Sequence, residues 1–104
     1  MNLALPEELR QLTILYAEDD DNIRLEVVHF LERRVGNLVL AANGEEALAA
    51  FIEHKPDIVI SDIMMPVMDG LELAAAIKER NSAVPVILTT AFNEAKYLHQ
   101  AISL

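Results

Sequence analysis

Four short apolar segments of the sequence alternate with longer segments in which apolar residues recur at helical spacing. This alternation is typical of βαβ units, in which a helix returns the chain to the next strand of a parallel sheet. The length of 104 residues leaves room for a single domain. We therefore expect an α/β domain with a doubly wound parallel sheet and helices on both faces. Its strands are expected at residues 13–17, 38–41, 57–61 and 85–89.

Each expected strand is followed by a segment that carries the start or stop signals of a helix. The first helix is predicted over residues 21–35, with Gly36 closing its C-terminus. Asp69 and Gly70 are predicted to form the turn that leads into a third helix, and residues 93–104 to form a fourth. One face of the first helix is expected to consist of the apolar residues Ile23, Val27, Phe30 and Leu31.

The charge balance and the absence of cysteine exclude several kinds of function. Eight Lys and Arg against seventeen Asp and Glu give a formal net charge of −9, so direct binding to nucleic acid is not expected. The sequence has no cysteine, which excludes disulfides, thiolate metal sites and a cysteine nucleophile. No uncharged segment reaches the ~18 apolar residues of a membrane span, and residues 1–12 lack the features of a signal peptide. We therefore expect no membrane contact and a cytoplasmic location.

Acidic and hydroxyl side chains stand where the expected strands end. Glu18 and Asp19 follow the first strand, Asp62 follows the third, and Thr90 follows the fourth. In an open parallel sheet, the C-terminal ends of the strands meet at one crevice. Carboxylates that share a crevice repel one another, and a divalent cation with a preference for oxygen ligands relieves that repulsion. The sequence therefore predicts a Mg²⁺ site at this edge of the sheet.

Three segments of the sequence carry a more specific pattern. They are residues 14–20 (ILYAEDD), 57–70 (DIVISDIMMPVMDG) and 85–91 (PVILTTA). In their order and approximate spacing they resemble the receiver domain of two-component response regulators. The central segment is the most specific, because an Asp closes an apolar strand just before Met-Met-Pro-x-Met-Asp-Gly. The resemblance covers residues 13–104, after a leader of residues 1–12, and implies a flavodoxin-like sheet with the strand order 2-1-3-4-5.

The resemblance also implies a role for each candidate site residue. Asp62 would be the phosphoacceptor of a phosphorelay, which receives a phosphoryl group from a sensor histidine kinase or a histidine phosphotransfer protein. Glu18 and Asp19 would hold Mg²⁺ together with Asp62 and the backbone carbonyl of Met64. Thr90 would be the hydroxyl that binds a phosphoryl oxygen and moves on activation. Such a module is a signalling phosphoacceptor and not an enzyme, with self-phosphorylation from small phosphodonors as its own chemistry.

The sequence departs from the family pattern after the fourth strand. Receiver domains continue with a fifth strand, which ends in a lysine that pairs with the phosphoryl group, and a fifth helix. The sequence ends at Leu104, so the domain of residues 13–104 is expected to lack this fifth βα unit. The edge of the fourth strand would then be exposed. An exposed edge predicts a homodimer, an exchange of elements with a second copy, or aggregation.

Other interpretations of these residues stay open at this point. The acidic run after the first strand can serve as a helix cap and a solvated first turn, and Asp20 or Asp21 is expected to have that role. The missing lysine leaves open a phosphorylation-incompetent receiver fragment, or a scaffold that acts through protein–protein interaction. A small Mg²⁺-dependent phosphohydrolase of the haloacid dehalogenase group needs an Asp two residues after its nucleophile, where this sequence has Met64.

Overall fold

The structure is a computed structural model in which residues 10–90 are described. Its strands begin and end within one residue of the predicted bounds, whereas the helix predicted at 93–104 lies outside the described residues. None of the helices in the described part is long and apolar enough to cross a bilayer. The elements are β1 (Thr13–Ala17), α1 (Asp21–Leu31), β2 (Asn37–Ala41), α2 (Gly44–His54), β3 (Ile58–Asp62), α3 (Gly70–Arg80) and β4 (Val86–Thr89).

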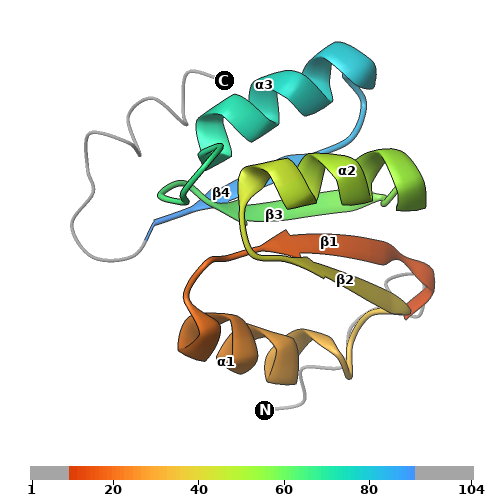
Figure 1. The fold of residues 1–104 in the computed structure, drawn as a ribbon. Helices are drawn as coiled ribbons and strands as arrows, with labels where there is room; N and C mark the ends of the chain where they lie inside the picture. The colour runs from red at the N-terminus through yellow and green to blue at the C-terminus, as the bar shows by residue number, and fades with distance from the viewer. Residues whose placement is uncertain (1–9, 91–104) are drawn as a thin grey trace.

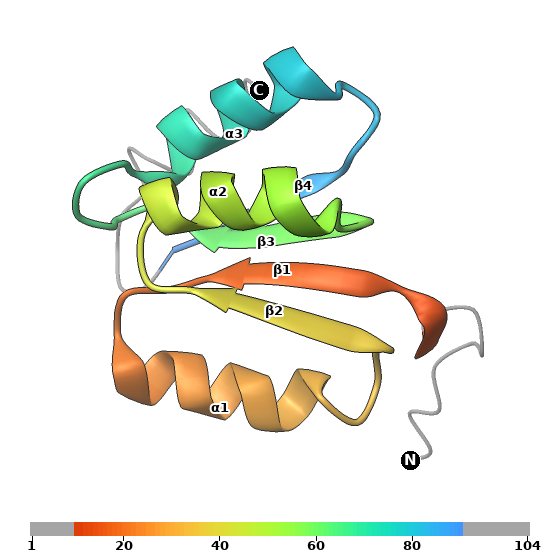
Figure 2. The same ribbon diagram turned by 45° about the vertical axis from the view of Figure 1, so that its right-hand side comes forward.

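The strands form one parallel sheet in the order β2-β1-β3-β4. Helix α1 covers one face of the sheet, and α2 and α3 cover the other (Figure 1 and Figure 2). The chain runs outward from β1 to β2, then crosses to β3 on the other side of β1. The ends of β1 and β3 therefore form the switch point, where open α/β sheets bind their ligands. The predicted flavodoxin-like, doubly wound fold is confirmed, with the expected order of the first four strands.

The main hydrophobic core lies between the sheet and helices α2 and α3. Leu15 and Val59 from the sheet and Leu73 and Ile77 from α3 have no exposed surface. Burying an aliphatic side chain of this size stabilises a fold by about 1.5–3 kcal/mol. This well-packed face therefore provides the rigid base from which the ends of β1 and β3 project.

The face of the sheet beside α1 is covered less completely. No residue of α1 is fully buried, and Ile87 of β4 is 50% exposed. The prediction that Phe30 shares a face with Ile23, Val27 and Leu31 is wrong, because those residues are half-buried whereas Phe30 is 53% exposed. The Arg34 guanidinium lies 3.9 Å from the centroid of its ring. The inward side of the helix is turned away from Phe30 and consists of the half-buried residues Ile23, Arg24, Val27, Val28 and Leu31.

Helix α1 ends at Leu31, four residues before the predicted end, and Gly36 does not cap it. The backbone amides of Arg34 and Val35 both donate to the Leu31 carbonyl oxygen, which tightens the chain into a turn. The reason for the glycine is tertiary. An ideal Cβ on Gly36 would lie 2.2 Å from the carbonyl oxygen of Arg10, so glycine permits the close approach of two backbone segments.

Polar caps begin the helices that follow β1 and β3. The side chain of Asp20 accepts hydrogen bonds from the backbone amides of Asn22 and Ile23 and caps α1. Asp69 begins α3 in a capping box with Glu72. Both caps were expected from the sequence, because they depend on neighbouring residues. They fix where each helix starts relative to the strand end before it.

Candidate functional site

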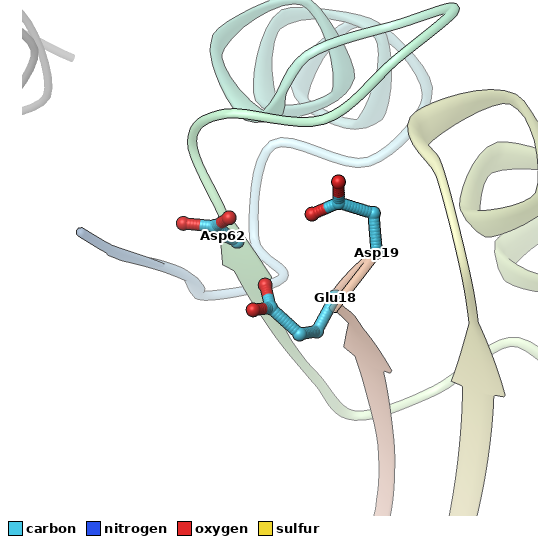
Figure 3. A group of neighbouring side chains, drawn as sticks. All are labelled: Glu18, Asp19 and Asp62. Carbon is cyan, nitrogen blue, oxygen red and sulfur yellow. The ribbon is translucent and has the colours of Figure 1, made fainter. Parts of the chain in front are cut away.

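Three carboxylates meet where β1 and β3 end. Ala17 pairs with Ser61 in the parallel register, so the next residues on the two strands, Glu18 and Asp62, leave the sheet side by side. Asp19 follows directly. One carboxylate oxygen of each lies within 4.8 Å of the others, and Figure 3 shows the three groups gathered in one space. The structure thus brings together the three carboxylates that the sequence placed at strand ends.

Burial makes this cluster costly when no cation is present. Glu18 is 3% exposed and Asp62 is 6% exposed, whereas Asp19 faces solvent. Desolvation, a hydrogen bond with the Asp62 carboxyl group and nearby negative charge raise the pKa of Glu18 to about 8. Desolvation also raises the pKa of Asp62, while hydrogen bonds from Glu18 and from the backbone amides of Ile63 and Met64 act in the opposite direction. In the absence of a cation, burial therefore favours the protonated form of Glu18, which can donate to the Asp62 carboxylate.

The donor set fits a hard divalent cation. Mg²⁺ takes oxygen ligands, binds through one or two carboxylates and keeps several waters. The cluster offers two buried carboxylates and one exposed carboxylate, so protein closes one side and water reaches the other. A divalent charge would also offset the desolvation and the repulsion that raise the pKa of Glu18.

A cavity of about 270 Å³ opens beside Glu18 and Asp62. Thr90 lines this cavity together with Glu18 and Asp62, so the structure places this residue next to two members of the acidic cluster. The neighbouring Thr89 also lines it, but its hydroxyl donates to the backbone carbonyl oxygen of Ser61 at 3.4 Å. The two adjacent threonines at the end of β4 therefore have different surroundings.

Tyr16, which the strand pattern alone did not single out, lines the same cavity. Its side chain is 3% exposed, and burial together with the charges of Glu18 and Asp62 raises the pKa of its hydroxyl to about 12. Tyr16 is therefore neutral at physiological pH. The sequence did contain a signal for Tyr16. Side chains on a strand alternate between its two faces, so Ile14, Tyr16 and Glu18 lie on the same face of this segment.

The loop between β3 and α3 forms the other side of the site. Met64 is 44% exposed, and its backbone amide is one of the donors to the Asp62 carboxylate. The main chain of Met64 therefore lies at the site, and any contact through it does not depend on the thioether. A second cavity, of about 460 Å³, is lined by Asp19, Met64, Met65, Pro66 and Asp69.

Fold and site together define the class of this protein. It is a doubly wound α/β domain with an acidic, oxygen-ligand site at the switch point of its sheet. Residues 14–104 match the response regulator receiver domain. The chain belongs to this family, whose members are signalling modules that bind Mg²⁺ at an acidic pocket.

Individual relatives agree with the family assignment. The transcriptional regulatory protein AfsQ1 of Streptomyces coelicolor is 38% identical over 82 residues, which cover 79% of this chain and 36% of the relative. The DNA-binding transcriptional regulator NtrC of Salmonella typhimurium is 40% identical over 88 residues, which cover 81% of this chain and 18% of the relative. A LuxR-family DNA-binding response regulator from Staphylococcus aureus superposes with a TM-score of 0.80 at 31% identity, covering 88% of this chain and 78% of that one. The chain thus spans about a third or less of the length of these two curated relatives.

Proposed function

We propose that this chain accepts a phosphoryl group on Asp62 from the phosphohistidine of a sensor histidine kinase or a histidine phosphotransfer protein. The observation that supports this function best is the cluster of Glu18, Asp19 and Asp62, whose carboxylate oxygens lie within 4.8 Å of one another. Membership of the receiver family supports the same reaction. The proposal includes a cytoplasmic location, where the phosphoryl donor is expected.

Asp62 is the nucleophile in this proposal. One of its carboxylate oxygens forms a bond to phosphorus while the phosphorus–nitrogen bond to the donor imidazole breaks, and the imidazole leaves with the electron pair. The reaction needs the ionised form of Asp62. Burial raises the pKa of Asp62, and the backbone amides of Ile63 and Met64 act against that rise. A bound divalent cation would favour the ionised form further.

The carboxylates of Glu18, Asp19 and Asp62, with the backbone carbonyl of Met64, would hold Mg²⁺. When bound, the ion neutralises negative charge on the phosphoryl oxygens during transfer. Buried Glu18 closes the site toward the protein interior. Exposed Asp19 and the cavity beside it leave the site accessible to a phosphoryl donor.

Thr90 would read the phosphorylated state. An aspartyl phosphate adds about −1.5 to −2 charges and three acceptor oxygens, by analogy with other phosphorylated side chains. These oxygens would lie next to the cavity that Thr90 lines, so its hydroxyl can donate to one of them. The new hydrogen bond would draw the end of β4 toward Asp62 and convert a change of charge into a change of conformation.

Intact-protein mass spectrometry after incubation with acetyl phosphate and Mg²⁺ tests this function. We expect an adduct of one phosphoryl group in the wild type, and none in Asp62→Asn or in the presence of a chelator. Glu79→Gln is a matched control, because it removes an exposed carboxylate at the far end of α3 and should be labelled like the wild type. A folded wild type without an adduct, or an adduct that persists in Asp62→Asn, would contradict the proposal.

A second candidate function is protein–protein interaction without phosphoryl transfer. Within the described residues β4 pairs on one side only, and its Ile87 is 50% exposed. Such an edge can pair with a second copy of the chain, as a homodimer or by exchange of elements. Sedimentation velocity should then show a dimer that Ile87→Lys disperses. A wild type that stays monomeric as its concentration rises would exclude this interaction, and the adduct assay separates it from the first candidate.

A further inference from the structure

Arg24 joins α1 to the loop that carries two of the three clustered carboxylates. Its Nη1 donates to the backbone carbonyl oxygen of Glu18 at 2.7 Å, and its Nη2 donates to Oδ1 of Asp21 at 2.5 Å. Its backbone amide donates to the carbonyl oxygen of Asp20 at 2.9 Å. The side chain is only 22% exposed, so the bond to Glu18 is partly shielded from water. One residue of the helix thus holds both ends of the segment 18–20.

The bond to Arg24 completes the restraints on the Glu18 peptide groups. The amide of Glu18 donates to the Ala41 carbonyl oxygen at 3.0 Å, just beyond the paired part of β1. Its carbonyl oxygen accepts from Arg24, so both backbone polar groups of Glu18 are bonded. Asp19 follows immediately, and its direction depends on how the backbone on either side is held. The planar guanidinium suits this function, because its donors have a fixed geometry that an ammonium group lacks.

Helix α1 has no fully buried residue, unlike α2 and α3, so a polar bond that ties it to the segment after β1 contributes to its position. The contact from Arg24 to Glu18 is such a bond, and it ends at a member of the acidic cluster. A displacement of α1 would therefore pull directly on the backbone that presents Glu18 and Asp19.

We propose that Arg24 is a positioning residue for the metal site, which fixes the backbone of residues 18–20 so that the carboxylates of Glu18 and Asp19 face Asp62. This inference rests on the proposed function. It adds that the affinity for Mg²⁺ depends on the placement of α1, because the helix and the loop are joined through one side chain.

The charge of Arg24 and its geometry predict opposite effects on metal binding. A cation near the cluster repels Mg²⁺, so its removal would tighten binding if charge alone mattered. Loss of a group that orients the ligands weakens binding instead, in metal sites generally by about 10- to 100-fold. The sign of the change therefore separates positioning from electrostatics.

Isothermal titration with MgCl₂ on the full chain measures this sign. We expect Arg24→Gln and Arg24→Lys both to bind Mg²⁺ about tenfold more weakly than the wild type. The lysine variant keeps the charge and loses only the planar pair of donors. Arg33→Gln removes an exposed cation just beyond α1 and should not weaken binding. Equal or tighter binding by both Arg24 variants would overturn the inference.

Hydrogen exchange in metal-free protein tests the positioning without reference to phosphorylation. The Glu18 amide should exchange about tenfold faster in Arg24→Gln than in the wild type, because the charged donor to the Glu18 carbonyl oxygen is lost. If the wild type binds no Mg²⁺, the proposed function fails, and this exchange rate still decides the inference. Faster exchange supports the positioning by Arg24, and unchanged exchange overturns it.

Discussion

Gly70, the first residue of α3, lies directly against the backbone of Asp62. An ideal Cβ on Gly70 would be 2.3 Å from the Asp62 carbonyl oxygen and 2.9 Å from Cα of Ile63. The Gly70 amide also donates to the Ile63 carbonyl oxygen at 2.8 Å. The start of α3 is therefore held against the end of β3, and a side chain at position 70 cannot fit unless backbone moves.

Gly70→Ala should consequently destabilise the protein although alanine favours helices. We expect a loss of about 2 kcal/mol or more in urea unfolding, since the obstructing atoms belong to the backbone. Mg²⁺ affinity should fall in the same variant, because the displaced backbone carries Asp62. Ala75→Gly, at an exposed position of α3, should cost only about 1 kcal/mol and leave Mg²⁺ affinity unchanged. Wild-type stability in Gly70→Ala would contradict the close approach.

The raised pKa of Glu18 predicts that the metal-free protein becomes less stable as the pH rises. The pKa of this carboxyl group rises from 4.5 to about 8 on folding. Between these values the folded chain holds a proton that the unfolded chain has released, so a rise in pH favours unfolding. We expect the free energy of unfolding to fall by on the order of 2 kcal/mol from about pH 5 to about pH 8.5, as measured by urea unfolding in the presence of a chelator.

Glu18→Gln is the control for this pH dependence, because an uncharged amide occupies nearly the same volume. The variant should be more stable than the wild type at high pH, and its free energy of unfolding should depend less on pH. Asp62 contributes in the same direction, since burial raises its pKa as well. Saturating Mg²⁺ should also flatten the wild-type profile by favouring the ionised carboxylates. An undiminished wild-type slope in Glu18→Gln would assign the pH dependence to another group.

Local signals in the sequence were sufficient for the strands and for the helix caps. Asp20 and Asp69 cap helices through the amides of residues two or three positions away, so their role can be predicted from neighbours alone. The predictions for Phe30, on the apolar face of α1, and for Gly36, as the cap of that helix, are wrong because the surroundings of both residues come from distant segments. The position of Phe30 depends on how α1 is rotated against the sheet, and Gly36 is required by the backbone of Arg10.

The same distinction applies to the site. The meeting of Glu18 and Asp62 follows from topology, because neighbouring parallel strands end at one edge. Arg24 was not predicted, since its bond to Glu18 depends on the reach of a long side chain back from the helix. The pKa of Glu18 could not be read from the sequence either, because it depends on burial within the assembled site.

Asp19 and Asp20 are adjacent acidic residues that should respond differently to loss of charge. Asp19 belongs to the carboxylate cluster, whereas Asp20 caps α1. Asp19→Asn should weaken Mg²⁺ binding at least about tenfold, because a ligand charge is lost. Asp20→Asn removes the same charge one residue away but keeps the cap, since asparagine caps helices as well as aspartate. Similar losses of affinity in the two variants, measured by titration with MgCl₂, would mean that only the summed charge matters.

Thr89 and Thr90 offer a matched pair for testing how phosphorylation is transmitted. Both residues line the cavity beside Asp62, but the Thr89 hydroxyl already donates to the Ser61 carbonyl oxygen. We expect the wild type to be stabilised on phosphorylation, and Thr90→Val to lose about 1 kcal/mol of that gain while still forming the adduct on Asp62. Thr89→Val should keep the full stabilisation on phosphorylation. Thermal unfolding before and after incubation with acetyl phosphate measures the difference, and equal gains in the two variants would remove Thr90 from the response.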